Sequence, residues 1–264
     1  MIRVLLVDDS QSVRAVMRRF FSKTPDIRVA GEAEDGEQAV RAVLDVQPHV
    51  VVMDIQMPNV DGYAAIERIM GLRPTPIVVL SSRATRNQLQ TAFEAIRRGA
   101  VEVLPKPEDT ASWQLLAESL PDTVRAVAQV QTRPRRERRP AKPPEPAALA
   151  APQALRWVAI GASTGGPAAI RDFFEEIPAD PPVSFLIVQH IASGFELGFV
   201  DWLNKEFPLD VRLARDGERP RRGAVRLAPG GSHLLLEPEG VLHLDTHTPA
   251  RRGHRPSADE LFLS

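Results

Sequence analysis

The stretch VVVMDIQMPNVDG at residues 50–62 places an aspartate, Asp54, directly after a short apolar run. Such a run, bounded by turn residues, is typical of a strand that is buried on both faces of a sheet. The same pattern recurs on both sides of this stretch and alternates with apolar residues at helical spacing. The expected strands are Ile2–Val7, Val29–Ala33, Val50–Met53, Ile77–Leu80 and Val101–Leu104, and the expected helices are Val13–Phe21, Glu37–Leu44, Tyr63–Met70, Leu89–Arg98 and Ser112–Ala128. Five strand–helix units predict a doubly wound parallel α/β domain over residues 1–120.

Residues 156–264 show a second alternating pattern, which predicts another doubly wound parallel-sheet domain. The expected elements are strands at Trp157–Gly161, Val183–Gln189, Val211–Ala214 and Ala224–Ala228, helices at Pro167–Ile177 and Glu196–Phe207, a hairpin of Leu234–Glu237 with Val241–Leu244, and a final helix opened by Pro256 and Ser257.

Between these halves, residues 121–155 differ in composition and are expected to form a linker. Residues 131–155 hold six prolines, six basic residues and six alanines, with no aromatic residue. Such a segment cannot bury enough apolar surface to offset its loss of conformational entropy. The arginines within residues 133–139 could form a docking or nucleic-acid patch, but solvated linker charge is the interpretation we favour.

The whole-chain composition excludes several classes of protein. The 264 residues carry a net charge of −1, which argues against nucleic acid as a partner. Cysteine is absent, so disulfide scaffolds and thiolate zinc sites are excluded. The first apolar run, Val4–Val7, is too short for a signal peptide, and no stretch approaches the roughly 20 apolar residues of a membrane span. We therefore expect a cytoplasmic protein that does not insert into a membrane.

Polar side chains follow four strands of the first predicted sheet. They are Asp8 and Asp9, Asp54, Ser81 and Lys106. The carboxyl ends of parallel strands share one edge of a sheet, where ligands bind. Clustered carboxylates suit Mg²⁺, and a lysine and a hydroxyl can hold phosphoryl oxygens. Any one of these residues could be only a helix cap, but the whole set predicts phosphoryl transfer onto Asp54.

The motifs at these strand ends resemble the receiver domains of two-component response regulators, which have a flavodoxin-like fold. They are VDDS at 7–10, MDIQMPNVDG at 53–62, LSS at 80–82 and PKP at 105–107. The resemblance implies that a chemotaxis histidine kinase phosphorylates Asp54. It also implies Mg²⁺ ligation by Asp9, Asp54 and the backbone carbonyl of Gln56 with support from Asp8, and phosphoryl binding by Ser81 and Lys106. Val103 stands where many receivers carry an aromatic switch residue, so signalling by an aromatic flip is not expected.

In the second half, the segment WVAIGASTGGP at 157–167 places Ser163 in a glycine-rich turn between a strand and a helix. His190 ends the next expected strand, and neighbouring parallel strands would bring the two side chains together as nucleophile and base. Loop amides could then form an oxyanion hole. A dinucleotide site and an α/β-hydrolase elbow both fit this pattern poorly. A capping serine and an unrelated histidine remain the simplest interpretation of the pair alone.

The motifs around this pair resemble the catalytic domain of chemotaxis protein-glutamate methylesterases, with a Rossmann-like fold. They are IGASTGGP at 160–167, LIVQH at 186–190, RLAPGGSHLLL at 226–236 and GHRPSAD at 253–259. The resemblance implies that Ser163 attacks the γ-carbonyl of a methylated glutamate on the cytoplasmic domain of a methyl-accepting chemoreceptor. His190 would take the serine proton and later activate water, releasing methanol, and glutamine would be deamidated by the same chemistry. Thr164 is a geometric candidate for an oxyanion or substrate contact.

The family's third catalytic residue is an aspartate in a Gly-Met-Gly-x-Asp-Gly stretch, which is not found before Ser264. We therefore expect an incomplete methylesterase domain. The predicted function is phosphorylation-activated methylesterase, in which the unphosphorylated receiver covers the Ser163–His190 cleft. The alternative is a non-catalytic response regulator that only accepts phosphate on Asp54. A DNA-binding regulator is disfavoured, because the second half is net acidic and lacks a helix-turn-helix pattern.

Overall fold

The structure, a computed structural model, describes residues 1–58, 61–81, 86–132, 156–192 and 194–264, with the backbone alone over 86–91. The first domain is a parallel sheet with strand order β2-β1-β3-β4-β5. Its strands are β1 (Ile2–Val7), β2 (Ile27–Ala33), β3 (Val50–Asp54), β4 (Ile77–Ser81) and β5 (Glu102–Pro105). Its helices are α1 (Gln11–Phe21), α2 (Gly36–Val46), α3 (Gly62–Leu72), α4 (Arg86–Arg98) and α5 (Thr110–Val127). This topology is the flavodoxin-like order expected for the domain.

The two faces of this sheet are covered by different helices, because successive strand residues point to opposite sides. Val4 and Leu6 pack with residues of α1 and α5, whereas Leu5 and Val7 pack with residues of α2, α3 and α4. The central strands β3 and β4 are accordingly buried along their whole length. The expected elements of this domain are therefore confirmed, each within a few residues of its expected bounds.

The first domain extends beyond residue 120, where the sequence led us to end it. Helix α5 continues through Pro121 to Val127, and Val124 and Val127 are fully buried against the core beside α1. Residues 121–127 thus belong to the first domain and not to a linker. Residues 133–155, including the arginines of the possible docking patch, lie outside the described residues.

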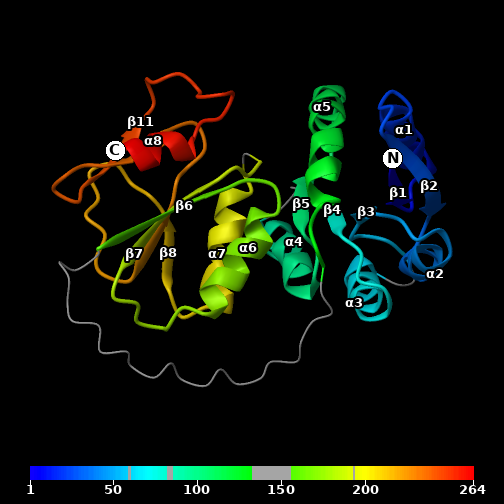
Figure 1. Cartoon of the computed structure of the whole chain (residues 1–264), viewed down its shortest axis with the longest axis horizontal. Helices are drawn as coiled ribbons and strands as arrows, with labels where there is room; N and C mark the ends of the chain where they lie inside the picture. Colours follow the sequence, from blue (N-terminus) through cyan, green and yellow to red (C-terminus); the bar gives the residue numbers. More distant parts are fainter. Residues whose placement is uncertain (59–60, 82–85, 133–155, 193) are drawn as a thin grey trace.

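The second domain is a four-stranded parallel sheet with strand order β6-β7-β9-β8. Its elements are β6 (Trp157–Ala162), α6 (Gly166–Glu175), β7 (Ser184–Gln189), α7 (Glu196–Glu206), β8 (Asp210–Leu213), β9 (Ala224–Leu227), β10 (His233–Leu236), β11 (Leu242–Asp245) and α8 (Ala258–Leu263). Helices α6 and α7 cover one face of the sheet, and the antiparallel β10–β11 hairpin and α8 cover the other (Figure 1). Both the alternation and the hairpin expected from the sequence are confirmed.

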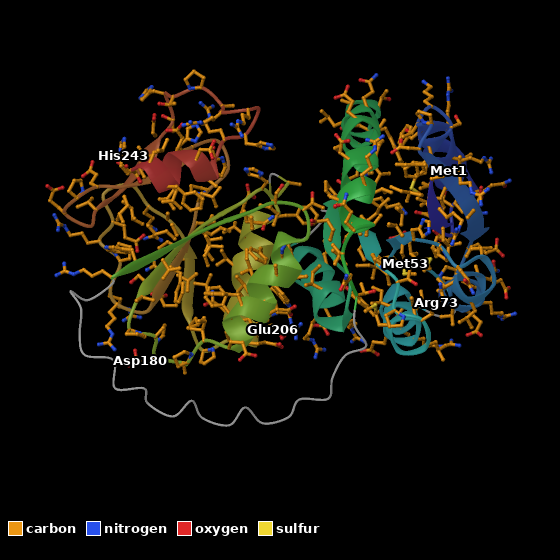
Figure 2. All side chains as sticks on the ribbon, in the orientation of Figure 1. Met1, Met53, Arg73, Asp180, Glu206 and His243 are labelled. Atoms are coloured by element: carbon orange, nitrogen blue, oxygen red, sulfur yellow. The ribbon has the colours of Figure 1, made fainter. Side chains whose placement is uncertain are left out.

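The two domains share one apolar core through α4 and α7, which pack against each other (Figure 1). Phe93 of α4 is fully buried, and its ring centroid lies 5.3 Å from that of Phe199 and 5.8 Å from that of Trp202. At the C-terminal end of α7, Glu206, labelled in Figure 2, faces the first domain. Its Oε1 lies 3.8 Å from Arg97 Nε of α4. The first domain is therefore docked on the second domain through its α4–β5 side. No helix within the described ranges is long and apolar enough to cross a membrane.

Candidate functional site

The carboxylates expected to hold a metal ion lie together at the carboxyl edge of the first sheet. Asp54 is the last residue of β3, and Asp8 and Asp9 follow β1, which pairs with β3. Each of the three aspartates offers an oxygen, and these oxygens lie within 4.8 Å of one another. Asp8 is fully buried and Asp54 nearly so, whereas Asp9 is exposed. Three hard oxygen donors at this separation fit Mg²⁺, which favours carboxylate ligands and retains water.

Lys106 supplies the positive charge of this edge. Its Nζ lies 2.5 Å from Asp54 Oδ2 and 2.8 Å from Asp8 Oδ2. Burial disfavours the charged lysine, but the hydrogen bonds and charges of Asp54 and Asp8 outweigh it and raise the pKa of Lys106. Burial likewise raises the pKa of Asp8, against the opposing effect of Lys106. The lysine thus remains a cation beside the Asp54 carboxylate.

The other two residues expected at this edge also lie beside Asp54. Ser81 ends β4, is buried, and accepts a hydrogen bond at its backbone carbonyl from Lys106 N at 2.7 Å. Gln56 N donates to Asp54 Oδ1 at 3.2 Å, which keeps the turn after β3 close to the carboxylate. Phosphoryl binding by Ser81 and metal ligation by the Gln56 carbonyl remain predictions.

Ser163 and His190 meet at the carboxyl edge of the second sheet. Ala162 is paired with Gln189 in adjacent strands, and each of the two residues lies one position further along its chain. His190 Nδ1 lies 3.3 Å from Ser163 Oγ. Gln189 Nε2 donates to the Ser163 carbonyl at 2.9 Å and holds the loop in place. A side chain at Gly166 would collide with Gln189, because a Cβ there would lie 1.8 Å from Gln189 Oε1.

The His190 ring is held by a second imidazole that the sequence analysis did not assign to the site. The His254 ring stacks on it with centroids 3.8 Å apart and planes 8° apart. Burial, followed by the nearby His254, lowers the pKa of His190, and the Pro256 backbone opposes this to a smaller extent. A neutral imidazole beside a hydroxyl is the state that a general base requires. His190 Nε2 is buried, with no hydrogen bond of normal geometry among the described residues.

The amides of the Ser163 loop lie at the start of α6, where the helix dipole is positive. Gly165 caps this helix with φ of 77°, in the left-handed region that favours glycine. Its amide donates to Glu102 Oε2 of the first domain at 2.7 Å. The loop therefore already holds a carboxyl oxygen beside Ser163.

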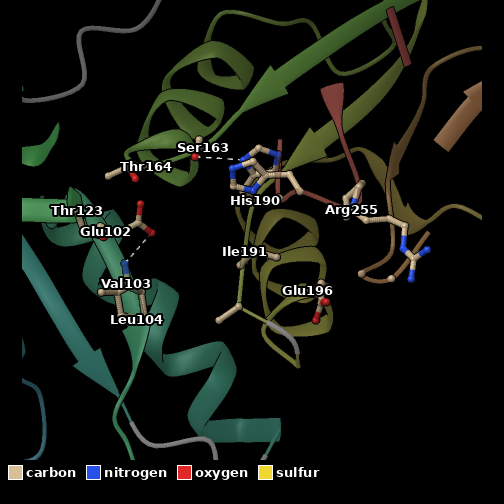
Figure 3. A pocket seen from close by; sticks show the side chains of 16 residues that line it. Glu102, Val103, Leu104, Thr123, Ser163, Thr164, His190, Ile191, Glu196 and Arg255 are labelled. Atoms are coloured by element: carbon tan, nitrogen blue, oxygen red, sulfur yellow. Dashed lines mark hydrogen bonds between the residues drawn. The ribbon is translucent and has the colours of Figure 1, made fainter. Parts of the chain in front are cut away.

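A cavity of about 540 Å³ surrounds this pair and is lined by both domains. Thr164, the further contact suggested by the sequence, is exposed and lines the cavity next to Ser163. Figure 3 shows Ser163 and His190 on one side and Glu102 of β5 on the other, with the Glu102 carboxyl group directed toward Thr164. Glu102 and His254 were missed by the sequence analysis. An acid inside an apolar strand, and a histidine inside the GHRPSAD motif, were the available signals.

Fold and site together indicate a response regulator whose output domain is a hydrolase. The response regulator receiver domain model matches residues 4–117, and the CheB methylesterase model matches residues 158–264. A protein-glutamate methylesterase/protein-glutamine glutaminase from Geobacter metallireducens is 40% identical over the whole of this chain, which spans 78% of that protein. One from Myxococcus xanthus is 42% identical, again over the whole chain and 76% of the relative. The chain belongs to the protein-glutamate methylesterase/protein-glutamine glutaminase family.

Solved structures resemble each domain separately. The response regulator domain of Thermotoga maritima CheB is 36% identical, with 50% of this chain and 98% of that chain covered and a TM-score of 0.46. The CheB methylesterase catalytic domain of the same organism is 33% identical, with 40% of this chain and 58% of that chain covered and a TM-score of 0.38.

Proposed function

We propose that this protein hydrolyses glutamate γ-methyl esters on the cytoplasmic domains of chemoreceptors, and deamidates glutamines there, under control of Asp54 phosphorylation. The observation that carries the proposal is the 3.3 Å approach of His190 Nδ1 to Ser163 Oγ beside the loop that begins α6. The names of the relatives, which describe protein-glutamate methylesterases and protein-glutamine glutaminases, support the same chemistry.

In the proposed reaction, Ser163 Oγ attacks the γ-carbonyl carbon of the substrate while His190 Nδ1 takes the hydroxyl proton. The carbonyl oxygen becomes an anion that the Gly165 amide and the Thr164 region can stabilise. When the C–O bond to the methoxy group breaks, His190 returns the proton and methanol leaves. Water then gives a proton to His190 and attacks the acyl-serine, which releases glutamate and restores the Ser163 hydroxyl.

In the proposed regulation, a chemotaxis histidine kinase transfers a phosphoryl group to Asp54. Asp8, Asp9 and Asp54 would hold Mg²⁺, which supplies positive charge to the transferring group when bound. Lys106 and Ser81 would then contact the phosphoryl oxygens. Residues of β5 and α5 line the esterase cavity, so phosphorylation has only to shift the population of this docked arrangement to expose Ser163.

The experiment measures methanol release from a methylated chemoreceptor domain, with and without a small phosphodonor and Mg²⁺. The phosphodonor should accelerate release by the unchanged protein and not by Asp54→Asn. Ser163→Ala should release no methanol under either condition. Equal rates with and without the phosphodonor would reject the regulation, and retained turnover in Ser163→Ala would reject the nucleophile.

One observation supports the second candidate function, a regulator that accepts phosphate without catalysis. Among the described residues no carboxylate makes a hydrogen bond of normal geometry to His190 Nε2. A serine protease that loses the orienting acid of its triad loses about 10⁴ in turnover. Phosphorylation of Asp54 without methanol release from any methylated receptor would favour this candidate.

A further inference from the structure

Glu102 is a buried acid whose carboxyl group reaches from the receiver into the second domain. It is the first residue of β5 and is 7% exposed. Its Oε2 accepts the Gly165 amide at 2.7 Å, and its Oε1 accepts the Val103 amide at 3.1 Å. No basic side chain among the described residues forms an ion pair with it. Because a buried charge without a cation costs free energy, this position calls for an explanation other than stability of the receiver.

The amide that donates to Glu102 across the domain interface belongs to the candidate esterase site. Gly165 lies two residues after Ser163, and its amide belongs to the loop that begins α6. Another amide of this loop, Gly166 N, already donates to the Ser163 carbonyl at 2.8 Å. Glu102 therefore occupies a donor that an oxygen of a bound substrate or product could use.

We propose that Glu102 is an internal ligand of the esterase site: the receiver presents a glutamate γ-carboxyl group to the Gly165 amide and so closes the site as an imitation of the reaction product. This proposal rests on the proposed function, in which the product is a glutamate side chain. A covering domain alone would block access by its bulk, whereas here the blocking group is a carboxyl group of the same kind as the reaction product. The receiver and the demethylated receptor then compete for one amide.

Such a ligand must also be able to leave, and the energetics of the buried carboxyl group allow it. Burial raises the pKa of Glu102 to about 7, against the weaker lowering effect of the Gly165 and Val103 amides. The ionised carboxylate is thus held less favourably when docked than in water. The charged and titratable groups that share its cavity are His190, His254, Glu196 and Arg255.

The strand that carries Glu102 also leads to the phosphorylation site. Lys106, bonded to Asp54, follows the last residue of β5, four positions after Glu102. At about 3.3 Å per residue these positions lie about 13 Å apart along one extended segment. Only four peptide units would have to carry a movement of Lys106 toward a phosphoryl group on Asp54 to Glu102.

The test compares the unphosphorylated 264-residue protein with Glu102→Ala, Glu102→Gln and the matched control Glu118→Ala. Glu118 is an exposed acid of α5 outside the cavity. One readout is covalent labelling of Ser163 by a serine-reactive fluorophosphonate, which needs no receptor substrate. The other is the amide resonance of Gly165, which reports the contact even where Ser163 is unreactive.

We expect Glu102→Ala to label severalfold faster and to shift the Gly165 resonance, because the Gly165 amide loses its acceptor. Glu102→Gln keeps an acceptor oxygen, so its labelling rate should lie between those of the unchanged protein and Glu102→Ala. Glu118→Ala should label at the rate of the unchanged protein. An unaltered Gly165 resonance in Glu102→Ala overturns the proposal. So does an unaltered labelling rate in that variant when a phosphodonor still accelerates labelling of the unchanged protein. Faster labelling of Glu102→Ala without methanol release from any receptor would keep the internal ligand and reject only the proposed function.

Discussion

Replacing Phe93 by alanine should separate the two domains while leaving each of them folded. The ring of Phe93 lies within 6.2 Å of three aromatic rings, centroid to centroid, and all three belong to the second domain: Phe195, Phe199 and Trp202. Loss of a fully buried phenylalanine costs about 3–5 kcal/mol. We take the lower value of about 3 kcal/mol, because part of the ring also packs within the receiver. At 1.4 kcal/mol per decade, this lowers the docking equilibrium constant about 10²-fold.

The assay combines the radius of gyration in solution with hydrogen exchange of α4 and α7. Phe93→Ala should increase the radius of gyration and speed exchange in both helices, since these helices cover each other only in the docked state. The matched control is Phe21→Ala, which removes the same ring from the α1–α5 side of the receiver and should lower its melting temperature without changing α7. A folded Phe93→Ala protein with the radius and α7 exchange of the unchanged protein would refute this account of the interface.

Three further outcomes follow from the charges at the two sites. Lys106→Ala should slow phosphate incorporation by about 10²-fold, as loss of one transition-state donor does, and a rate equal to that of the unchanged protein would exclude this role. Because the pKa of His190 is lowered, the imidazole stays neutral below the ordinary 6.5, so the acid limb of the ester-hydrolysis rate should have its midpoint below pH 6.5; a midpoint above 6.5 would contradict it. The pKa of Glu102, about 7 when docked against an ordinary 4.5, means that docking takes up a proton. Docking should therefore strengthen as the pH falls from about 7 toward 4.5, and the radius of gyration should decrease. Glu102→Gln should remove this pH dependence.

The strand ends were predictable from the sequence because the chemistry there depends on local order. A run such as Val50–Met53 followed by an acid fixes both a buried strand and the edge at which Asp54 lies. The approach of Ser163 to His190 also followed, since consecutive strands of a βαβ unit are commonly neighbours. The order of the remaining strands did not follow, because β9 enters the sheet between β7 and β8.

Glu102 and His254 could not be assigned because their contacts depend on placement across long chain separations. Glu102 meets Gly165 across 63 residues that include the segment between the domains, whose composition says nothing about how the domains dock. The His254 ring reaches His190 from the turns before α8, and a lone histidine in a turn has no spacing to test. The domain boundary was placed at residue 120 because the composition changes after it, whereas the burial of Val124 and Val127 keeps the rest of α5 in the first domain.

The four residues of β5 connect two contacts of the receiver: that of Glu102 with Gly165 at one end, and that of Lys106, just after the strand, with Asp54. Many proteins could supply a receiver that takes phosphate on an aspartate and carries a lysine in the position of Lys106. A chimera with such a receiver would still be phosphorylated. It would lack the carboxyl group that binds the Gly165 amide, unless the new receiver also had an acid four positions before that lysine. On this proposal, the unit to exchange is smaller than a domain: it is the segment Glu102–Lys106, which consists of the short edge strand β5 and the lysine that follows it.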